Sequence, residues 1–192
     1  MFQQAIVKEF FEEEQDIISK PKYRAEVQKV IDDHQLKYVL AQFVDIHGSA
    51  KTKSVPISGL KAIEGAGVGF AGFAISGMGM QPHGPDFMVK GDLSSLTPVP
   101  WQPGYGRVVC EGYVNGKPHP YDSRYVLRKQ VERLSAKGWT LNTGLEPEFS
   151  LFRRGEDGTL KAVDESDNLD KPCYDYKGLS RSRQFLERIT EA

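Results

Sequence analysis

Two glutamates on either side of a proline are the residues whose types and spacing best suit chemistry. Glu146 and Glu148 flank Pro147 within a largely apolar run. Residues two apart in a strand point to the same face, so the two carboxylates would lie close together. Their repulsion is relieved when one carboxyl is protonated or when a cation neutralises both. Such oxygen ligands suit Mg²⁺ or Mn²⁺, although a solvated strand face carries the same pair.

The segment that must position these glutamates is predicted as a long strand, residues 139–152, with one break at Pro147. It follows the clearest helix of the sequence, which Asp122 caps and Gly138 ends. A final helix is expected to begin at a cap on Ser180. One strand and two helices cannot close a core, so this region is interpreted as the start of an unfinished α+β unit.

The preceding region is predicted to form a first mixed unit of helices and strands. Apolar residues at helical spacing are followed by β-branched runs and turn signals, of which Asn115-Gly116 is the strongest. The expected elements are a helix at 22–34, strands at 36–44, 50–55, 92–98 and 107–114, and a short helix capped by Ser58.

Composition excludes several classes of protein. The chain has 192 residues, and its 25 Lys and Arg against 26 Asp and Glu give a net charge of -1, which argues against nucleic-acid or membrane-surface partners. The longest stretch of low charge, residues 68–89, is broken by glycine and proline and cannot span a bilayer. No targeting signal is recognised, so a cytoplasmic location is expected.

The remaining side chains that could do chemistry are assigned structural roles. Two cysteines without CxxC spacing form neither a disulfide framework nor a zinc knuckle, and Cys110 is expected to be buried in a strand. Ordinary surface or turn roles are expected for His34, His47 and His119, while His83 could face a substrate. The bare GxGxxG match at 67–72 has no strand before it and no helix after it, so it supports a phosphate loop poorly.

Several short motifs together resemble the glutamine synthetase family. The segment from Gly144 to Phe149 is similar to the family's metal-binding strand, G-x-E-x-E-F. The family's catalytic domain opens with an acidic residue followed by an arginine, and Asp122-Ser123-Arg124 is similar to this opening. A Pro-Trp pair precedes it in the family, as Pro100-Trp101 does here. The motif V-D-x-x-G of the N-terminal domain is matched by residues 44–48. All of these occur in the family's order.

The resemblance implies an α+β fold in three parts. Residues 1–21 are an N-terminal extension, residues 22–118 a β-grasp-like domain, and residues 119–192 the beginning of a glutamine-synthetase-type catalytic domain that is truncated here. The catalytic domain of the family is several times longer than this last part. The sequence is therefore identified as an N-terminal portion of such a protein.

The resemblance also implies a reaction. In the family, ATP phosphorylates the γ-carboxylate of glutamate, and an amine then displaces phosphate from γ-glutamyl phosphate. Mg²⁺ or Mn²⁺ ions assist, and Glu146 and Glu148 match two of their ligands. The implied small-molecule partners are glutamate, an amine and ATP. The active sites of the family lie between subunits of a homo-oligomeric ring.

One departure from the family concerns the amine. The common pattern F-D-G-S-S has an aspartate that helps to bind and deprotonate ammonium, whereas this chain has Phe70-Ala71-Gly72, with Ala71 at the aspartate position. Loss of that carboxylate weakens ammonium binding and leaves room for a methyl group. The pattern is closest to the branch that includes γ-glutamylmethylamide synthetases. A methylamine ligase is therefore favoured, with ammonia as the other amine.

A second departure is that no catalytic set is complete. The family's further metal ligands and its basic ATP-binding and glutamate-binding residues lie downstream of residue 192. Activity of these residues alone is therefore not expected. The alternative is a non-catalytic relic or a subunit-assembly module of the same family. An unrelated α+β protein would have to reproduce several motifs in order.

Overall fold

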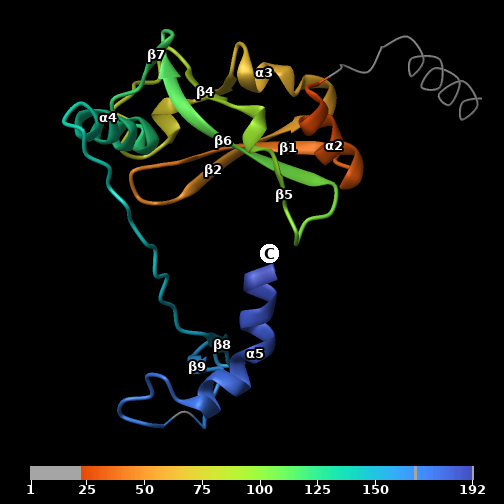
Figure 1. Ribbon diagram of the computed structural model, residues 1–192, viewed down its shortest axis with the longest axis vertical. Coiled ribbons are helices and arrows are strands. Elements are labelled where there is room, and N and C mark those ends of the chain that lie inside the picture. Colours follow the sequence, from red (N-terminus) through yellow and green to blue (C-terminus); the bar gives the residue numbers. More distant parts are fainter. Residues whose placement is uncertain (1–22, 167, 192) are drawn as a thin grey trace, which may run out of the picture. The chain divides into compact units, whose positions relative to one another are not determined.

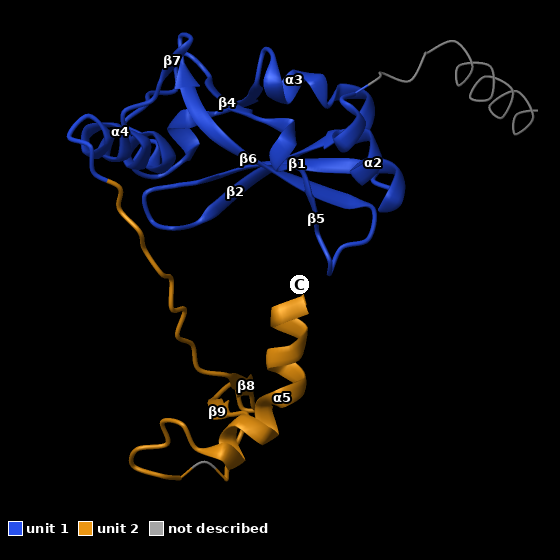
Figure 2. Cartoon of the chain, in the orientation of Figure 1, with its two compact units in different colours: residues 1–139 blue, residues 140–192 orange. Residues whose placement is uncertain are grey.

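The structure, a computed structural model, describes residues 23–166 and 168–191. The predicted extension at 1–21 lies outside the described residues. The chain divides into two compact units, Met1–Trp139 and Thr140–Ala192, which Figure 2 shows in different colours. Each unit is described by itself below. The boundary that the sequence predicts between 118 and 119 stays a prediction about the longer family fold.

The first unit opens with a helix and a hairpin, as predicted. Helix α2 (Ala25–Asp33) buries Val27 and Ile31 on one face. Strands β1 (Tyr38–Val44) and β2 (Ala50–Pro56) pair antiparallel over their full lengths. Alternate residues of β1 are buried, which explains why its apolar run forms a strand with one face in the core.

Two predictions in the middle of this unit are wrong. The chain turns through η1 (Ile57–Gly59) and α3 (Lys61–Glu64), and Ser58 caps neither, because Pro56 and Leu60 occupy the cap positions. The strand expected at 92–98 is mostly a turn, because the Asp92 carboxylate accepts a hydrogen bond from the Ser94 N–H and starts η3 (Leu93–Ser95). Only β5 (Thr97–Pro98) is extended, while β4 (Phe87–Gly91) is a strand that the sequence analysis missed.

Strand β6 (Tyr105–Val114) organises the seven-stranded sheet, whose main order is β2-β1-β6-β4-β3. Its first half pairs parallel with β1 and antiparallel with β5. Its second half pairs antiparallel with β4 and with β7 (Lys117–Pro118), across the predicted turn at 115–116. Strand β3 (Val68–Phe70) forms the far edge beside β4. Figure 1 shows β6 as the long green strand through this sheet.

An aromatic group fills the centre of the first unit. The Phe43 ring meets Phe70 edge-on at 5.3 Å and Phe87 at 5.1 Å between ring centroids. Cys110 is fully buried in β6, as expected. Gly112 in the same strand has no room for a side chain, because the Phe87 ring lies 2.0 Å from where its Cβ would stand. The core is thus built across β1, β4 and β6.

Helix α4 (Ser123–Ser135) closes the first unit as predicted. The Asp122 carboxylate caps it by accepting from the Tyr125 N–H, and Gly138 follows its end with a positive φ of 72°. That conformation favours glycine. The predicted helix boundaries are therefore confirmed.

The second unit departs from its prediction. Residues 139–151 form no strand, and only β8 (Phe152–Arg154) pairs, with β9 (Leu160–Ala162). The expected strand at 139–152 is wrong here because a ladder needs a partner, and none lies beside 139–150 among the described residues; Leu151 O accepts a single bond from Val163 N, next to β8. Helix α5 (Tyr176–Glu191) begins before Ser180, since Asp175 accepts the hydrogen bond from Gly178 N at 3.0 Å. No helix of the described part of the chain is long and apolar enough to cross a membrane.

Candidate functional site

The two glutamates of the predicted metal site lie on the extended segment of the second unit. Glu146 and Glu148 are both exposed, and neither has an ion pair or a hydrogen bond within residues 23–166 and 168–191. Over those same residues, no three His, Cys, Asp or Glu side chains come together as a metal-binding group. The carboxylates are the right type of ligand for Mg²⁺ or Mn²⁺, but the described residues do not complete a site.

The second predicted site is the loop that starts with Phe70, Ala71 and Gly72. Phe70 ends β3 and is buried, Ala71 is exposed, and Gly72 is buried at the start of η2 (Gly72–Ala74). The Lys53 ammonium lies 5.2 Å from the Phe70 ring centroid and donates to the Gly69 carbonyl. The core therefore anchors both neighbours of Ala71 and leaves its methyl group at the surface.

Glycine is needed where this loop turns back. A Cβ on Gly72 would stand 2.1 Å from Met80 Sδ and 3.0 Å from Phe87 Cβ. Phe87 is fully buried and cannot move aside easily. A larger residue at position 72 would therefore push the loop out and displace Ala71.

The turn between β1 and β2 supports this loop. No sequence motif indicates this support. The Asp45 carboxylate accepts from the N–H groups of His47 and Ser49, each at 2.9 Å. These bonds, with the Ser49 contribution largest, lower the pKa of Asp45 and keep it ionised. His47 Nε2 then lies 3.2 Å from Ser76 Oγ of the loop. The motif at residues 44–48 is thus a brace for residues 72–77.

Three large apolar side chains are exposed around the braced loop. Ile46, Phe73 and Tyr121, which we call the loop surface, are each about half exposed, at 52%, 52% and 53%. Ile46 packs over Gly77, and the Tyr121 ring lies 3.2 Å from where a Cβ on Gly79 would stand. An apolar surface on an ordered loop is typical of a protein–protein contact.

A buried polar pair joins β6 to α4. His119 lies in a turn, one of the two roles expected for it, but its side chain is not at the surface: it is only 7% exposed and its ring packs between Phe87 and Tyr121, each centroid 5.5 Å away. Burial lowers the pKa of His119, against a smaller opposing effect of Asp122. The local sequence carries no signal of this burial, since the contact with Phe87 is made by folding.

Asp122 is the other member of this pair. Its Oδ2 accepts from Gly112 N at 3.0 Å and its Oδ1 from Tyr125 N at 2.8 Å, so one carboxylate ties the centre of β6 to the first turn of α4. Burial raises the pKa of Asp122, partly offset by these two N–H donors. Within the first unit, this pair fixes where α4 leaves the sheet.

Comparisons with known proteins agree with the motifs. Residues 120–192 match the family described as glutamine synthetase, catalytic domain. The chain is 59% identical over 169 residues to a glutamate–methylamine ligase of Methyloversatilis universalis, covering 88% of this chain and 38% of that protein. It is 36% identical over 158 residues to a glutamine synthetase of Pyrococcus horikoshii, covering 82% of this chain and 34% of that protein.

Solved structures agree as well. The structure described as "Apo GmaS without ligand" matches with a TM-score of 0.69 and 25% identity, over 84% of this chain and 38% of that one. "GmaS/ADP complex-Conformation 1" matches with a TM-score of 0.70 and 25% identity, over 86% of this chain and 37% of that one. The predicted α+β fold class is confirmed by these matches.

The fold and the sequence together define an α+β chain that matches part of a glutamate–methylamine ligase and part of several glutamine synthetases. The chain belongs to the glutamine synthetase family, and its identity to the glutamate–methylamine ligase exceeds its identity to the glutamine synthetase of P. horikoshii. It spans a little over a third of the length of the curated relatives it matches.

Proposed function

We propose that this chain is part of an ATP-dependent ligase that joins methylamine to the γ-carboxylate of glutamate through γ-glutamyl phosphate. The observation that carries the proposal is the 59% identity to a glutamate–methylamine ligase over 88% of this chain. A neighbouring structure in complex with ADP supports a nucleotide substrate. Ammonia is the alternative amine, because glutamine synthetases match the chain as well.

Glu146 and Glu148 are proposed as two ligands of Mg²⁺ or Mn²⁺ in the complete protein. Such an ion, when bound, would neutralise charge on a transferring phosphoryl group. The exposed, extended backbone of residues 139–151 leaves both carboxylates accessible. Further ligands must come from outside the described residues, which also supply no complete catalytic set of their own.

Ala71 is proposed to select the amine. Its methyl group is exposed on a loop that the core and the turn at 45–49 hold in place. An aspartate at this position would attract the ammonium ion and would crowd an N-methyl group. An alanine favours methylamine because the methyl groups of the amine and of Ala71 bury apolar surface together.

The loop surface of Ile46, Phe73 and Tyr121 is proposed to face a second copy of the chain. Its exposed apolar side chains surround the loop that carries Ala71, so contact there would place Ala71 at the partner's site. This agrees with the homo-oligomeric ring that the family resemblance implies. The cytoplasmic location expected from the sequence stays a prediction.

The function is tested by ADP release from the native polypeptide, with its intact mass measured beside it. We expect release that depends on glutamate and is faster with methylamine than with ammonia. The Ala71→Asp variant of that enzyme should shift the preference toward ammonia, by about tenfold for one charge-assisted contact. Ala74→Asp, exposed in the same loop, is the matched control and should keep the preference for methylamine.

Two results would count against the proposal. A native polypeptide of 21.5 kDa that releases no ADP would favour an assembly module of the same family. An active enzyme whose amine preference is the same in Ala71→Asp and Ala74→Asp would remove Ala71 from the amine site while leaving the ligase assignment intact.

A further inference from the structure

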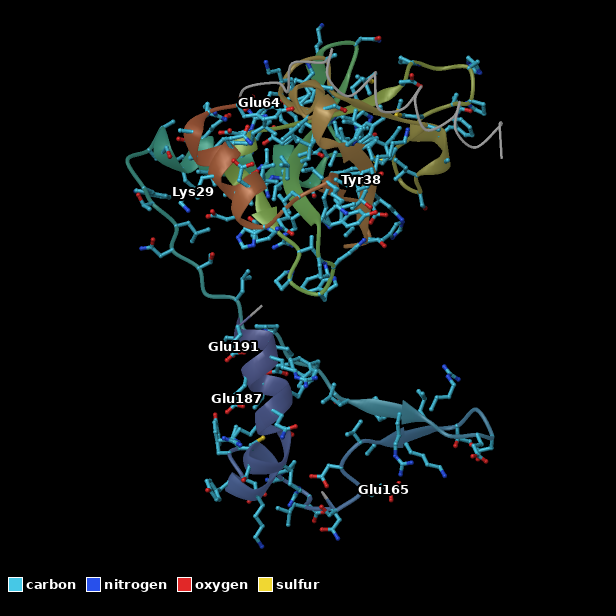
Figure 3. The ribbon with its side chains drawn as sticks, turned by 90° about the vertical axis from the view of Figure 1, so that its right-hand side faces the viewer. Lys29, Tyr38, Glu64, Glu165, Glu187 and Glu191 are labelled. Carbon is cyan, nitrogen blue, oxygen red and sulfur yellow. The ribbon has the colours of Figure 1, made fainter. Side chains whose placement is uncertain are left out.

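A hollow of about 560 Å³ lies on the first unit, and none of the three residues of the loop surface lines it. It is bordered by the end of β4, by η3, by the second half of β6 and by the start of α4. Glu64, the last residue of α3, stands at its rim and is labelled in Figure 3. Sites for small molecules are commonly concave, with volumes of roughly 300–1,000 Å³.

The hollow exists because the sheet is interrupted along one edge of β6. Strand β5 pairs with Gly106 and Arg107, and β4 pairs only from Cys110 onward. Between these two strands the chain leaves the sheet as η3, and Ser95 Oγ accepts from Val109 N at 3.3 Å in place of a backbone carbonyl. The gap is therefore a built feature of the fold, with its backbone donor satisfied.

Each carboxylate that borders the hollow is already paired with an arginine. One Arg24 nitrogen, Nη2, lies 2.7 Å from Glu64 Oε1 and 2.9 Å from Asp92 Oδ1. The Arg128 guanidinium lies 2.8 Å from Glu111 Oε2. The hydrogen bonds from Ser94, and after them the one from Arg24, hold the pKa of Asp92 down at about 2. Each of the three carboxylates therefore has an arginine within 3 Å, although Glu64 and Asp92 share one, Arg24.

The two cations that line the hollow have no such partner. Neither Lys90 nor Arg124 forms an ion pair with any carboxylate in the part of the chain that the structure describes. Lys90 Nζ lies 5.8 Å from the Tyr113 ring centroid, and Lys90 is half-buried. When the two arginines that pair with the lining acids are counted, the hollow has one more positive than negative side chain, and its two unpaired cations come from two different elements, β4 and α4.

We propose that this hollow binds a small molecule through an oxyanion, a carboxylate or a phosphate, held between Lys90 and Arg124. Arginine presents its donors in a fork that fits such a group, and the lysine adds a second point of charge. Ser94, whose hydroxyl bonds to Asp92, also lines the hollow. The site does not depend on the proposed ligase activity, and Ala71 is not among the residues that line it.

The test titrates the chain with inorganic phosphate in one series and with succinate in another, by calorimetry at low ionic strength. We expect saturable binding of phosphate, of succinate or of both. The anion with the lower Kd shows whether the hollow recognises a phosphate or a carboxylate. Lys90→Gln and Arg124→Gln should each weaken it about tenfold, as the loss of one charge-assisted hydrogen bond does. Lys129→Gln, an exposed cation elsewhere on α4, should bind as the parent does.

Circular dichroism would first establish that each variant keeps the fold of the parent. Two outcomes would overturn the proposal. One is that neither anion saturates. The other is that Lys129→Gln weakens binding as much as Lys90→Gln and Arg124→Gln do, which would mean general attraction to a basic surface and not a site.

Discussion

Among single residues, His119 has the environment furthest from what the sequence predicts. Proline precedes and follows it, which favours a turn, and the turn is there. Its side chain is nevertheless buried against Phe87, which lies more than thirty residues earlier in the chain. A contact between residues so far apart leaves no local periodicity to detect. The buried imidazole therefore becomes visible only in the folded chain.

This burial predicts a pH dependence of stability. The pKa of His119 lies below its ordinary value of 6.5 in the folded chain, mainly because burial disfavours the charged form. At pH values between the lowered pKa of the folded chain and 6.5, His119 is protonated more in the unfolded chain than in the folded one. The free energy of unfolding therefore falls as the pH drops below about 6.5. The urea midpoint should therefore be lower at about pH 5.5 than at about pH 7.5, and His119→Asn should reduce that difference.

Asparagine suits this test because its side-chain oxygen can still accept from Tyr121 N, as His119 Nδ1 does at 3.3 Å. His34→Asn, at an exposed histidine beyond α2, is the control and should leave the difference unchanged. A His119→Asn chain that loses as much stability on acidification as its parent would show that another group causes the loss.

At the scale of elements, the connection between β6 and α4 depends on one carboxylate. Asp122→Ala removes an N-cap worth about 0.5–2 kcal/mol and leaves the buried Gly112 N–H without a partner, at about 1–3 kcal/mol. We expect the free energy of unfolding, measured in urea near neutral pH, to fall by roughly 1.5–5 kcal/mol from these two losses. Asp122→Asn keeps one acceptor oxygen and should lose clearly less.

The comparison of these two variants is the control for side-chain volume. Equal losses in Asp122→Ala and Asp122→Asn would contradict a role for the hydrogen bonds. A loss below about 0.5 kcal/mol in the alanine variant would contradict the cap itself.

How far an element can be predicted depends on where its stabilising contacts come from. The hairpin of β1 and β2 and helix α4 carry their signals locally, as a turn between alternating strands and as a capping aspartate before a helix. The strand expected at 139–152 has suitable residues, yet a strand needs a partner that the described chain does not bring to it. The sequence predicts serine caps at Ser58 and Ser180, but other residues start these helices.

The same distinction applies to the sites. Glu146 and Glu148 were found by spacing and by family resemblance, but a metal site needs further ligands whose proximity only folding decides. Phe70, Ala71 and Gly72 were found by a departure from a family pattern. No sequence motif indicates the brace from Asp45 and His47 or the hollow beside Lys90. Both are formed by segments that are distant in the sequence.

At the scale of the whole molecule, the second compact unit begins with an exposed segment. Within the described part of the chain, the backbone N–H and C=O groups of residues 140–150 form no hydrogen bond to other backbone groups. The segment includes the exposed side chains of Leu145 and Phe149. Exposed backbone without such bonds is cut first by proteases. Brief chymotrypsin treatment of the chain should therefore cleave within 139–151 and leave a product that contains β1 to α4, identified by intact mass.

The buried core of the first unit supplies the internal comparison for that experiment. Aromatic residues such as Phe43 and Phe87 are equally good chymotrypsin sites by type, but both are buried. If chymotrypsin cleaved within β1 or β4 as fast as it cleaves within 139–151, the first unit would not be independently folded.

The parallel pairing of β1 with β6 bears on how the chain is made. Tyr38 lies opposite Tyr105, and strands β2 to β5 are synthesised between them. At roughly 5–20 residues per second, a ribosome takes on the order of seconds to extend from one strand to the other, far longer than a hairpin takes to form. The nascent β1–β2 hairpin therefore leaves the ribosome with its inner edge unpaired, and the speed of translation sets how long that edge stays open to chaperones or to other chains.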